Sequence, residues 1–192
     1  MERTIALVAL FAALIAALGI IPQVTLPFGV PITAQSLGVM LCGTVLGAKR
    51  GTMAVLLFML LVCLGLPLLS GGRGGLGVIV SPTGGFFIAF PVAAFVAGMI
   101  TQSWRSVPLA VSAGVAAAAG GIVLYAFGII GLAQVLDKTL GEAALLVTAF
   151  IPGDAVKAVL AGLITSALYR ARPRAVLSRA LPRAPALAAP MF

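Results

Sequence analysis

The segment Phe150 to Lys157 places an acid and a base within a stretch that is otherwise apolar. Ionisable side chains at membrane depth are costly, and they are usually retained for a transport pathway or a ligand. Asp154 and Lys157 are three positions apart, which on a helix puts them on one face, close enough to pair or to share a polar ligand. A carboxylate accepts from N–H groups, and an ammonium donates to a carbonyl or a carboxylate. We expect a binding site here; alternatively, Asp154 caps the helix that follows Pro152 and Gly153.

The composition is that of an integral membrane protein. Of the 192 residues, 62% are hydrophobic and 8% are charged, and no charge occurs between Thr4 and Ala48. A hydrocarbon core of about 30 Å requires about 20 apolar helical residues, which allows roughly six spans. We therefore predict an all-α integral membrane protein with six transmembrane helices, formed by one membrane domain over residues 1–170. There is no histidine, and Cys42 and Cys63 lack metal-ligand spacing, so we expect no metal site.

Hydrophobic runs, separated by polar or glycine- and proline-rich segments, give the expected spans. They are Ile5 to Ile21, about Gln35 to Leu46, Met53 to Leu69, Phe86 to Ile100, Val107 to Leu136 and Ala143 to Leu168. The last region is compatible with one span or with two short helices that meet at Pro152 and Gly153. The three prolines of Pro22 to Ala34 predict a loop or a re-entrant segment. Residues 171–192 are basic and rich in proline and alanine, a composition typical of disorder.

The positive charges orient the protein, because short cytoplasmic loops carry an excess of Lys and Arg. With six spans, nine of the twelve fall on the side of the two termini: Arg3, Lys49, Arg50, Arg105, Arg170, Arg172, Arg174, Arg179 and Arg183. Arg73 and Lys138 fall on the opposite side, and Lys157 lies within the membrane. Both termini are therefore predicted to be cytoplasmic. The formal net charge of +8 then reflects topology and contact with anionic lipid, and we expect no nucleic-acid binding.

This orientation brings polar groups from distant parts of the chain to the outer half of the membrane. The loops around Thr33, Arg73 and Thr83 fall outside, and Tyr125 and Asp154 lie in the outer half of their spans. We predict a pocket with Asp154 at its floor and the glycine-rich loops as its roof. A network that only packs helices together would use some of the same residues.

Small residues recur on the first predicted helix. Ala9, Ala13 and Ala17 are spaced by four, so one face is nearly flat, and flat faces let another helix approach closely. The spacing fits a partner protein and packing within the same chain equally well.

Five short motifs occur in this order: Pro31-Ile32-Thr33-x-Gln35, Lys49-Arg50-Gly51, Gly71-Gly72-x-Gly74-Gly75-x-Gly77, Pro82-Thr83-Gly84-Gly85 and Pro152-Gly153-Asp154-x-x-Lys157. Together they resemble the BioY family, the biotin-specific S-components of energy-coupling-factor (ECF) transporters. The resemblance implies a multi-pass protein of the inner (cytoplasmic) membrane that captures biotin. It also implies a transmembrane coupling protein and paired ABC-type ATPases as partners, with Asp154 and Lys157 associated with the ligand. The alanine face resembles the surface that meets the coupling protein.

Other functions remain open at this stage. The chain has no Gly-x4-Gly-Lys-Ser/Thr motif, so we expect ATP to be used only by partner subunits and no cofactor to be held here. The absence of histidine and of an acid pair at depth argues against an intramembrane enzyme. A self-sufficient small-molecule transporter should show a continuous polar pathway or inverted repeats, and neither is visible. That transporter, or an S-component for a different vitamin, is the alternative to biotin capture.

Overall fold

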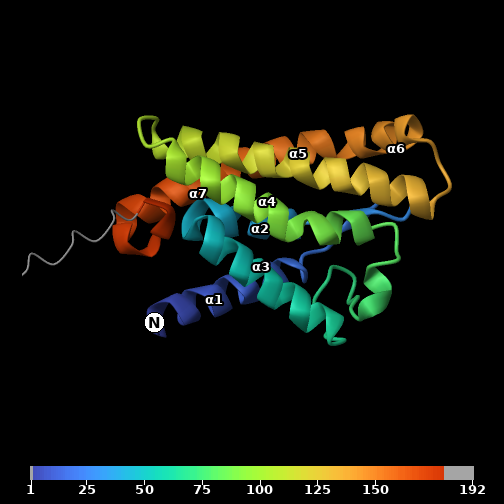
Figure 1. Ribbon diagram of the computed structural model, residues 1–192, viewed down its shortest axis with the longest axis horizontal. Helices are drawn as coiled ribbons and strands as arrows, with labels where there is room; N and C mark the ends of the chain where they lie inside the picture. The colour runs from blue at the N-terminus through green and yellow to red at the C-terminus, as the bar shows by residue number, and fades with distance from the viewer. Residues whose placement is uncertain (1, 180–192) are drawn as a thin grey trace, which may run out of the picture.

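The computed structural model describes residues 2–179, and most of them are helical (Figure 1). The α-helices are α1 Glu2–Leu18, α2 Gln35–Leu46, α3 Ala48–Cys63, α4 Gly84–Ser103, α5 Leu109–Val135, α6 Leu140–Val147 and α7 Ile151–Ala171. Short 3-10 helices are η1 Leu76–Val78, η2 Thr148–Phe150, η3 Pro173–Ala175 and η4 Leu177–Arg179. The strands β1 Val24–Thr25 and β2 Pro31–Ile32 form a small antiparallel hairpin within the predicted loop.

Three helical segments are long and apolar enough to cross a membrane: Gly84–Ser103, Leu109–Val135 and Leu140–Ala171. Helix α2 is a shorter apolar helix with the predicted bounds. Large apolar side chains such as Leu60, Leu145 and Val156 are exposed on the outside of the bundle. Exposure on this scale suits a lipid surrounding, where hydrocarbon chains cover such side chains.

The helices pack through small residues. A Cβ atom added to Gly98 of α4 would collide with the backbone of Ala48, and one added to Gly162 of α7 would collide with the carbonyl oxygen of Ala110 in α5. Backbones that approach this closely gain van der Waals contact in an environment that offers no hydrophobic driving force between helices. These two glycines therefore allow α4 to lie close against α3, and α7 close against α5.

The last hydrophobic region is one continuous helical segment in which α6 and α7 are joined by the 3-10 turn η2. The cap of α7 is Phe150, and Asp154 lies in the first turn. The alternative that Asp154 serves as the helix cap is therefore wrong.

The third helix begins earlier than the predicted span from Met53, and Lys49 and Arg50 are part of it. Gly47, at φ 81°, makes the turn by itself, and both cations belong to the first turn of α3. A positive φ is easily reached only by glycine, so the chain reverses over a single residue.

Residues 171–179 differ from the disorder predicted for the tail. Val176 and Ser178 are fully buried, and Ser178 Oγ donates to the carbonyl oxygen of Thr44 in α2 at 2.5 Å. The physical reason is that a few apolar and small residues between the arginines pack against the bundle. The average composition of the segment does not reveal this packing. Residues 180–192, with Arg183, lie outside the described part of the chain.

Arg179 anchors this segment to the end of the bundle. Its Nη2 donates to the carbonyl oxygen of Trp104 at 2.8 Å, to that of Val107 at 3.3 Å and to Ser112 Oγ at 2.7 Å. The Arg3 side chain also donates to the carbonyl oxygen of Arg174. The segment after α7 is thus tied to α1, α2 and the connection between α4 and α5.

We expect Arg179→Ala to lower the free energy of unfolding by about 1–3 kcal/mol, because hydrogen bonds from a charged donor are lost. Thermal unfolding of the parent protein and the variant, in the same detergent at the same concentration, measures the effect. Arg172→Ala is the control, since Arg172 is exposed. Equal unfolding midpoints for the two variants would contradict an anchoring role.

Candidate substrate-binding site

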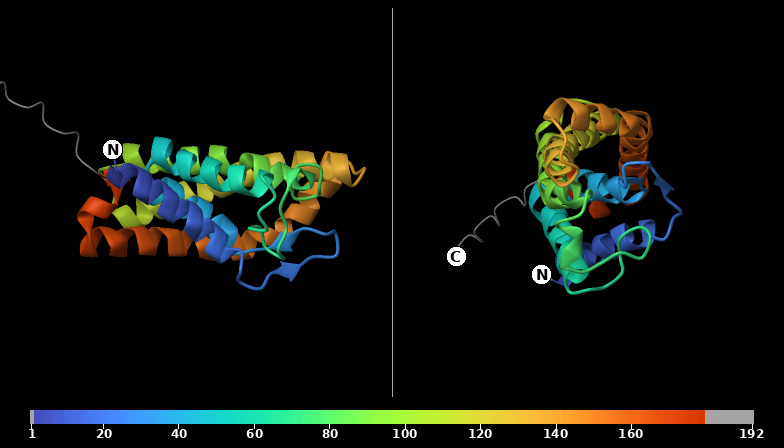
Figure 2. Two further views of the ribbon diagram at one scale, coloured as in Figure 1. Left: turned by 90° about the horizontal axis from the view of Figure 1, so that it is seen from below. Right: turned by 90° about the vertical axis from the view of Figure 1, so that its right-hand side faces the viewer.

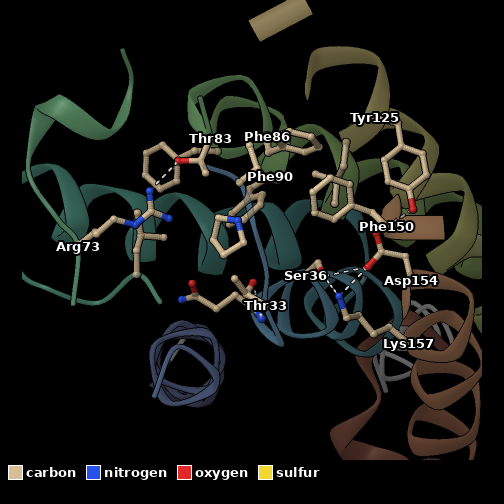
Figure 3. A pocket seen from close by; sticks show the side chains of 16 residues that line it. Thr33, Ser36, Arg73, Thr83, Phe86, Phe90, Tyr125, Phe150, Asp154 and Lys157 are labelled. Carbon is tan, nitrogen blue, oxygen red and sulfur yellow. Dashed lines mark hydrogen bonds and ion pairs between the residues drawn. The ribbon is translucent and has the colours of Figure 1, made fainter. Parts of the chain in front are cut away.

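A pocket opens at the end of the bundle that carries the hairpin and the glycine-rich loop (Figure 3). It contains about 620 Å³ of space free of protein atoms, including its open mouth, which suits a small organic molecule. Its lining residues are Val30, Pro31, Thr33, Gln35, Ser36, Leu69, Arg73, Thr83, Phe86, Phe87, Phe90, Leu124, Tyr125, Phe150, Asp154 and Lys157. All six predicted substrate-binding residues, from Thr33 to Lys157, are among them.

Asp154 is the centre of a polar cluster on one side of the pocket. Lys157 Nζ lies 2.7 Å from Asp154 Oδ1, and the Tyr125 hydroxyl donates to Oδ2 at 2.8 Å. Ser36 Oγ donates to Oδ1 at 3.3 Å and accepts from Lys157 Nζ at 2.9 Å. The side chains of Lys157 and Asp154 are only 14% and 12% exposed. The cluster therefore draws one residue from α2, one from α5 and two from α7.

This cluster is not saturated. A carboxylate has about four acceptor positions and an ammonium has three donors. Asp154 accepts three hydrogen bonds from protein groups, and Lys157 donates two. Within residues 2–179, one acceptor position on Oδ2 and one N–H of Lys157 therefore have no protein partner.

Arg73 supplies a second polar group, across the pocket from Asp154 (Figure 3). Its Nε donates to the carbonyl oxygen of Ser70 at 3.3 Å and its Nη1 to Thr83 Oγ1 at 3.1 Å. Thr83 is in turn held by Ser81 at 2.8 Å. Burial lowers the pKa of the Arg73 guanidinium, which still remains protonated at neutral pH. Within residues 2–179 no carboxylate pairs with it, so this cation can meet an anionic group of a ligand.

Aromatic side chains form the wall between the two polar groups. Phe86 and Phe150 have ring centroids 5.7 Å apart, and Phe150 meets Phe28 edge-on at 6.2 Å. Phe87 and Phe90 lie 5.9 Å apart on α4. Sequence reasoning missed this wall and also Ser36. Their only signals are the three- and four-residue spacings of the phenylalanines from Phe86 to Phe90 and the position of Ser36 beside Gln35.

Gln35 holds the pocket together without offering a group to a ligand. Its Nε2 donates to the carbonyl oxygens of Ile15 at 3.1 Å and Leu68 at 3.0 Å. Its Oε1 accepts from Ser70 N at 3.0 Å and Ser70 Oγ at 3.3 Å. All four positions of the amide are thus used within the protein. Thr33 plays a related part, since its Oγ1 accepts from Gln35 N at 3.3 Å.

The alanines predicted to bind a partner do not line this pocket. Ala9, Ala13 and Ala17 are exposed on α1, whereas Ala12 and Ile15 of the same helix are buried. The three alanines therefore lie on the outer face of α1, away from its buried side. Among residues 2–179 no cluster of three or more His, Cys, Asp or Glu side chains is arranged to hold a metal ion.

Comparisons with known proteins agree with this geometry. Residues 2–174 match the model of the BioY family. The chain is 51% identical over 189 residues to the biotin transporter BioY of Rhodobacter capsulatus, covering 93% of this chain and 100% of that protein. It is 50% identical over 178 residues to the biotin transporter BioY of Rhizobium etli, covering 89% and 95%. A crystal structure of the S-component for biotin from an ECF-type ABC transporter superposes with a TM-score of 0.82 at 31% identity, covering 88% of this chain and 92% of that one.

Proposed function

The chain belongs to the BioY family, and on that premise we propose that it captures biotin as the substrate-binding S-component of an ECF-type transporter. The observation that carries the proposal is the two-ended pocket, with Asp154 and Lys157 at one end and Arg73 at the other. Biotin offers two ureido N–H donors and a ureido carbonyl, an apolar ring system and a carboxylate on a flexible chain. A pocket with an aromatic wall between two polar ends matches the order of these groups along the biotin molecule.

The charges favour one direction of binding. A ligand carboxylate beside Asp154 would meet a like charge, whereas Arg73 is a cation without a carboxylate partner in the described chain. We therefore assign the biotin carboxylate to Arg73. The ureido group then lies at the other end, where Asp154 Oδ2 accepts an N–H and Lys157 donates to the carbonyl.

Transport would require partners, because binding alone does not move a ligand against a gradient. We assign that work to a transmembrane coupling protein and ABC-type ATPases, the assembly type named for the similar solved S-component. The exposed face of Ala9, Ala13 and Ala17 supports this, since a flat helix surface permits close contact with another helix. In this role the protein is a transport component and carries out no catalysis.

The same role requires a defined topology. Helices α1 to α5 and the continuous α6–α7 segment give six crossings, and α1 begins at the end of the bundle where α7 finishes (Figure 2). That end carries eight described cations: Arg3, Lys49, Arg50, Arg105, Arg170, Arg172, Arg174 and Arg179. By the charge rule it faces the cytoplasm, and the pocket opens to the outside of the inner membrane.

We expect Asp154→Asn to weaken biotin binding at least about tenfold, because a charge-assisted hydrogen bond of roughly 1.5–3 kcal/mol is replaced by a neutral one. Equilibrium binding to purified protein measures the affinity. Asp137→Asn is the matched control: Asp137 is exposed at φ 51°, a conformation that asparagine accepts readily. Unchanged affinity in a folded Asp154→Asn variant would remove this carboxylate from the recognition site.

For the topology, we expect cysteines at Leu76 and Lys138 to react with an impermeant maleimide on intact cells, and a cysteine at Arg172 to react only after permeabilisation. All three positions are exposed. The background is Cys63→Ser, because Cys63 is partly accessible whereas Cys42 is buried. Labelling of the Arg172 site on intact cells would overturn the orientation.

For the partner surface, Ala13→Trp should leave biotin binding intact while the coupling protein no longer co-purifies, because the indole prevents close helix approach. Ala118→Trp, at an exposed alanine of α5, is the control and should retain the coupling protein. Co-purification that is equal for both variants would assign the alanine face to lipid.

A further inference from the structure

A second groove lies at the cytoplasmic end of the bundle, away from the biotin pocket. It is formed where α1 and α3 begin and α4 ends, and these three ends are on the left-hand side of the molecule in Figure 1. The groove contains about 980 Å³ of space free of protein atoms, much of it open to the surroundings. Its lining residues are Thr4, Leu46, Ala48, Lys49, Arg50, Met53, Phe95, Met99 and Gln102.

The rim of this groove carries two positive charges. Lys49 is exposed and Arg50 is half-buried, and neither forms an ion pair or a hydrogen bond through its side chain with residues 2–179. Glu2 is the one described carboxylate at this end of the bundle, and it pairs with neither cation. Both cations lie in the first turn of α3, which has no side-chain cap, so the positive end of the helix dipole adds to their field.

The groove below the rim is apolar. Met53, Phe95 and Met99 are 54%, 40% and 48% exposed. Met53 lies four residues beyond Lys49 along α3, about 6 Å deeper in the membrane at 1.5 Å per residue. The apolar surface continues with Leu56 on α3 and Val92 on α4, which are also exposed. A small soluble anion would leave this surface uncovered, whereas a molecule with an anionic head and hydrocarbon chains satisfies both parts.

We propose that this groove binds one anionic phospholipid. Lys49 and Arg50 hold the headgroup phosphate, and Met53, Phe95 and Met99 pack against an acyl chain. The lipid bridges α1, α3 and α4 at the cytoplasmic surface and is recognised by charge as well as by its chains. Binding at this site differs from the general attraction between the basic end of the protein and a negatively charged membrane. It requires Lys49 and Arg50 and does not require the other cations at the same end.

Trp104 provides the probe, because it is the single tryptophan of the chain and lies two residues beyond Gln102 of the groove. It is 46% exposed, and bromine atoms quench tryptophan fluorescence only at short range. The full-length protein is reconstituted in phosphatidylcholine vesicles that contain a small, increasing fraction of brominated phosphatidylglycerol or of brominated phosphatidylcholine. A bound anionic lipid predicts half-maximal quenching at a clearly lower fraction of the brominated phosphatidylglycerol.

Each Lys or Arg near an anionic lipid surface contributes on the order of fivefold in binding, so the preference should be about tenfold or more. Lys49→Gln/Arg50→Gln should abolish it. Arg170→Gln/Arg172→Gln removes the same charge from exposed positions at the same end and should retain it. Circular dichroism and thermal unfolding check that both variants remain folded.

Three results of the quenching titration would overturn the proposal: no preference in the parent protein, an unchanged preference in Lys49→Gln/Arg50→Gln, or an equal loss in both double variants. The last would indicate only general surface attraction. Millimolar inorganic phosphate, compared with chloride of equal ionic strength, should not release the lipid. Release by phosphate would instead assign the rim to a soluble anion.

Discussion

The structure depends most on how one carboxylate is kept charged in a largely apolar bundle. Removing an ion from water costs several kcal/mol even after relaxation, and the cost is met only with good geometry and further hydrogen bonds. Asp154 has both, with Lys157 at 2.7 Å and hydrogen bonds from Tyr125 and Ser36. These partners come from three helices, so the same interactions that keep the carboxylate charged also fix α2, α5 and α7 relative to one another. Both members of the pair also line the pocket.

Gln35 holds the loops in place through hydrogen bonds, as Asp154 does for the helices. Loops that cover a ligand site must be held in place without regular secondary structure, and each buried backbone group needs a partner. One side-chain amide at the start of α2 satisfies backbone groups of α1 and of the segment before the glycine-rich loop. That segment includes Ser70, whose carbonyl oxygen receives Arg73. The guanidinium across the pocket from Asp154 is thus positioned through the same amide.

The two ends of the bundle differ in their polar side chains. The hairpin, the glycine-rich loop and the start of α4 surround the pocket, where a few polar groups are almost fully used by protein partners. The opposite end gathers cations, of which Lys49 and Arg50 have no side-chain partner among residues 2–179. The segment after α7 is anchored there through Arg179. Small residues along α4, α5 and α7 join the ends into one closely packed bundle. The proposed ligand pocket and the proposed lipid groove therefore lie at opposite ends of the helices.

The sequence by itself determined the class of the protein and most of its helices, because hydrophobic runs and charge distribution are properties of short segments. It also singled out Asp154, Lys157 and Arg73, since ionisable groups stand out against an apolar background. It did not determine which aromatic side chains face the pocket, since Phe86 of α4 and Phe150 of η2 belong to segments that both lie against α5 and that meet only in the folded bundle. The disorder predicted for residues 171–179 was wrong, because burial of Val176 and Ser178 depends on a site formed by helices distant in the sequence, and η4 packs against α2 and α4. Spacing along the chain fixes which residues share a helix face, whereas the direction of that face is decided by close packing between helices, which only the tertiary structure contains.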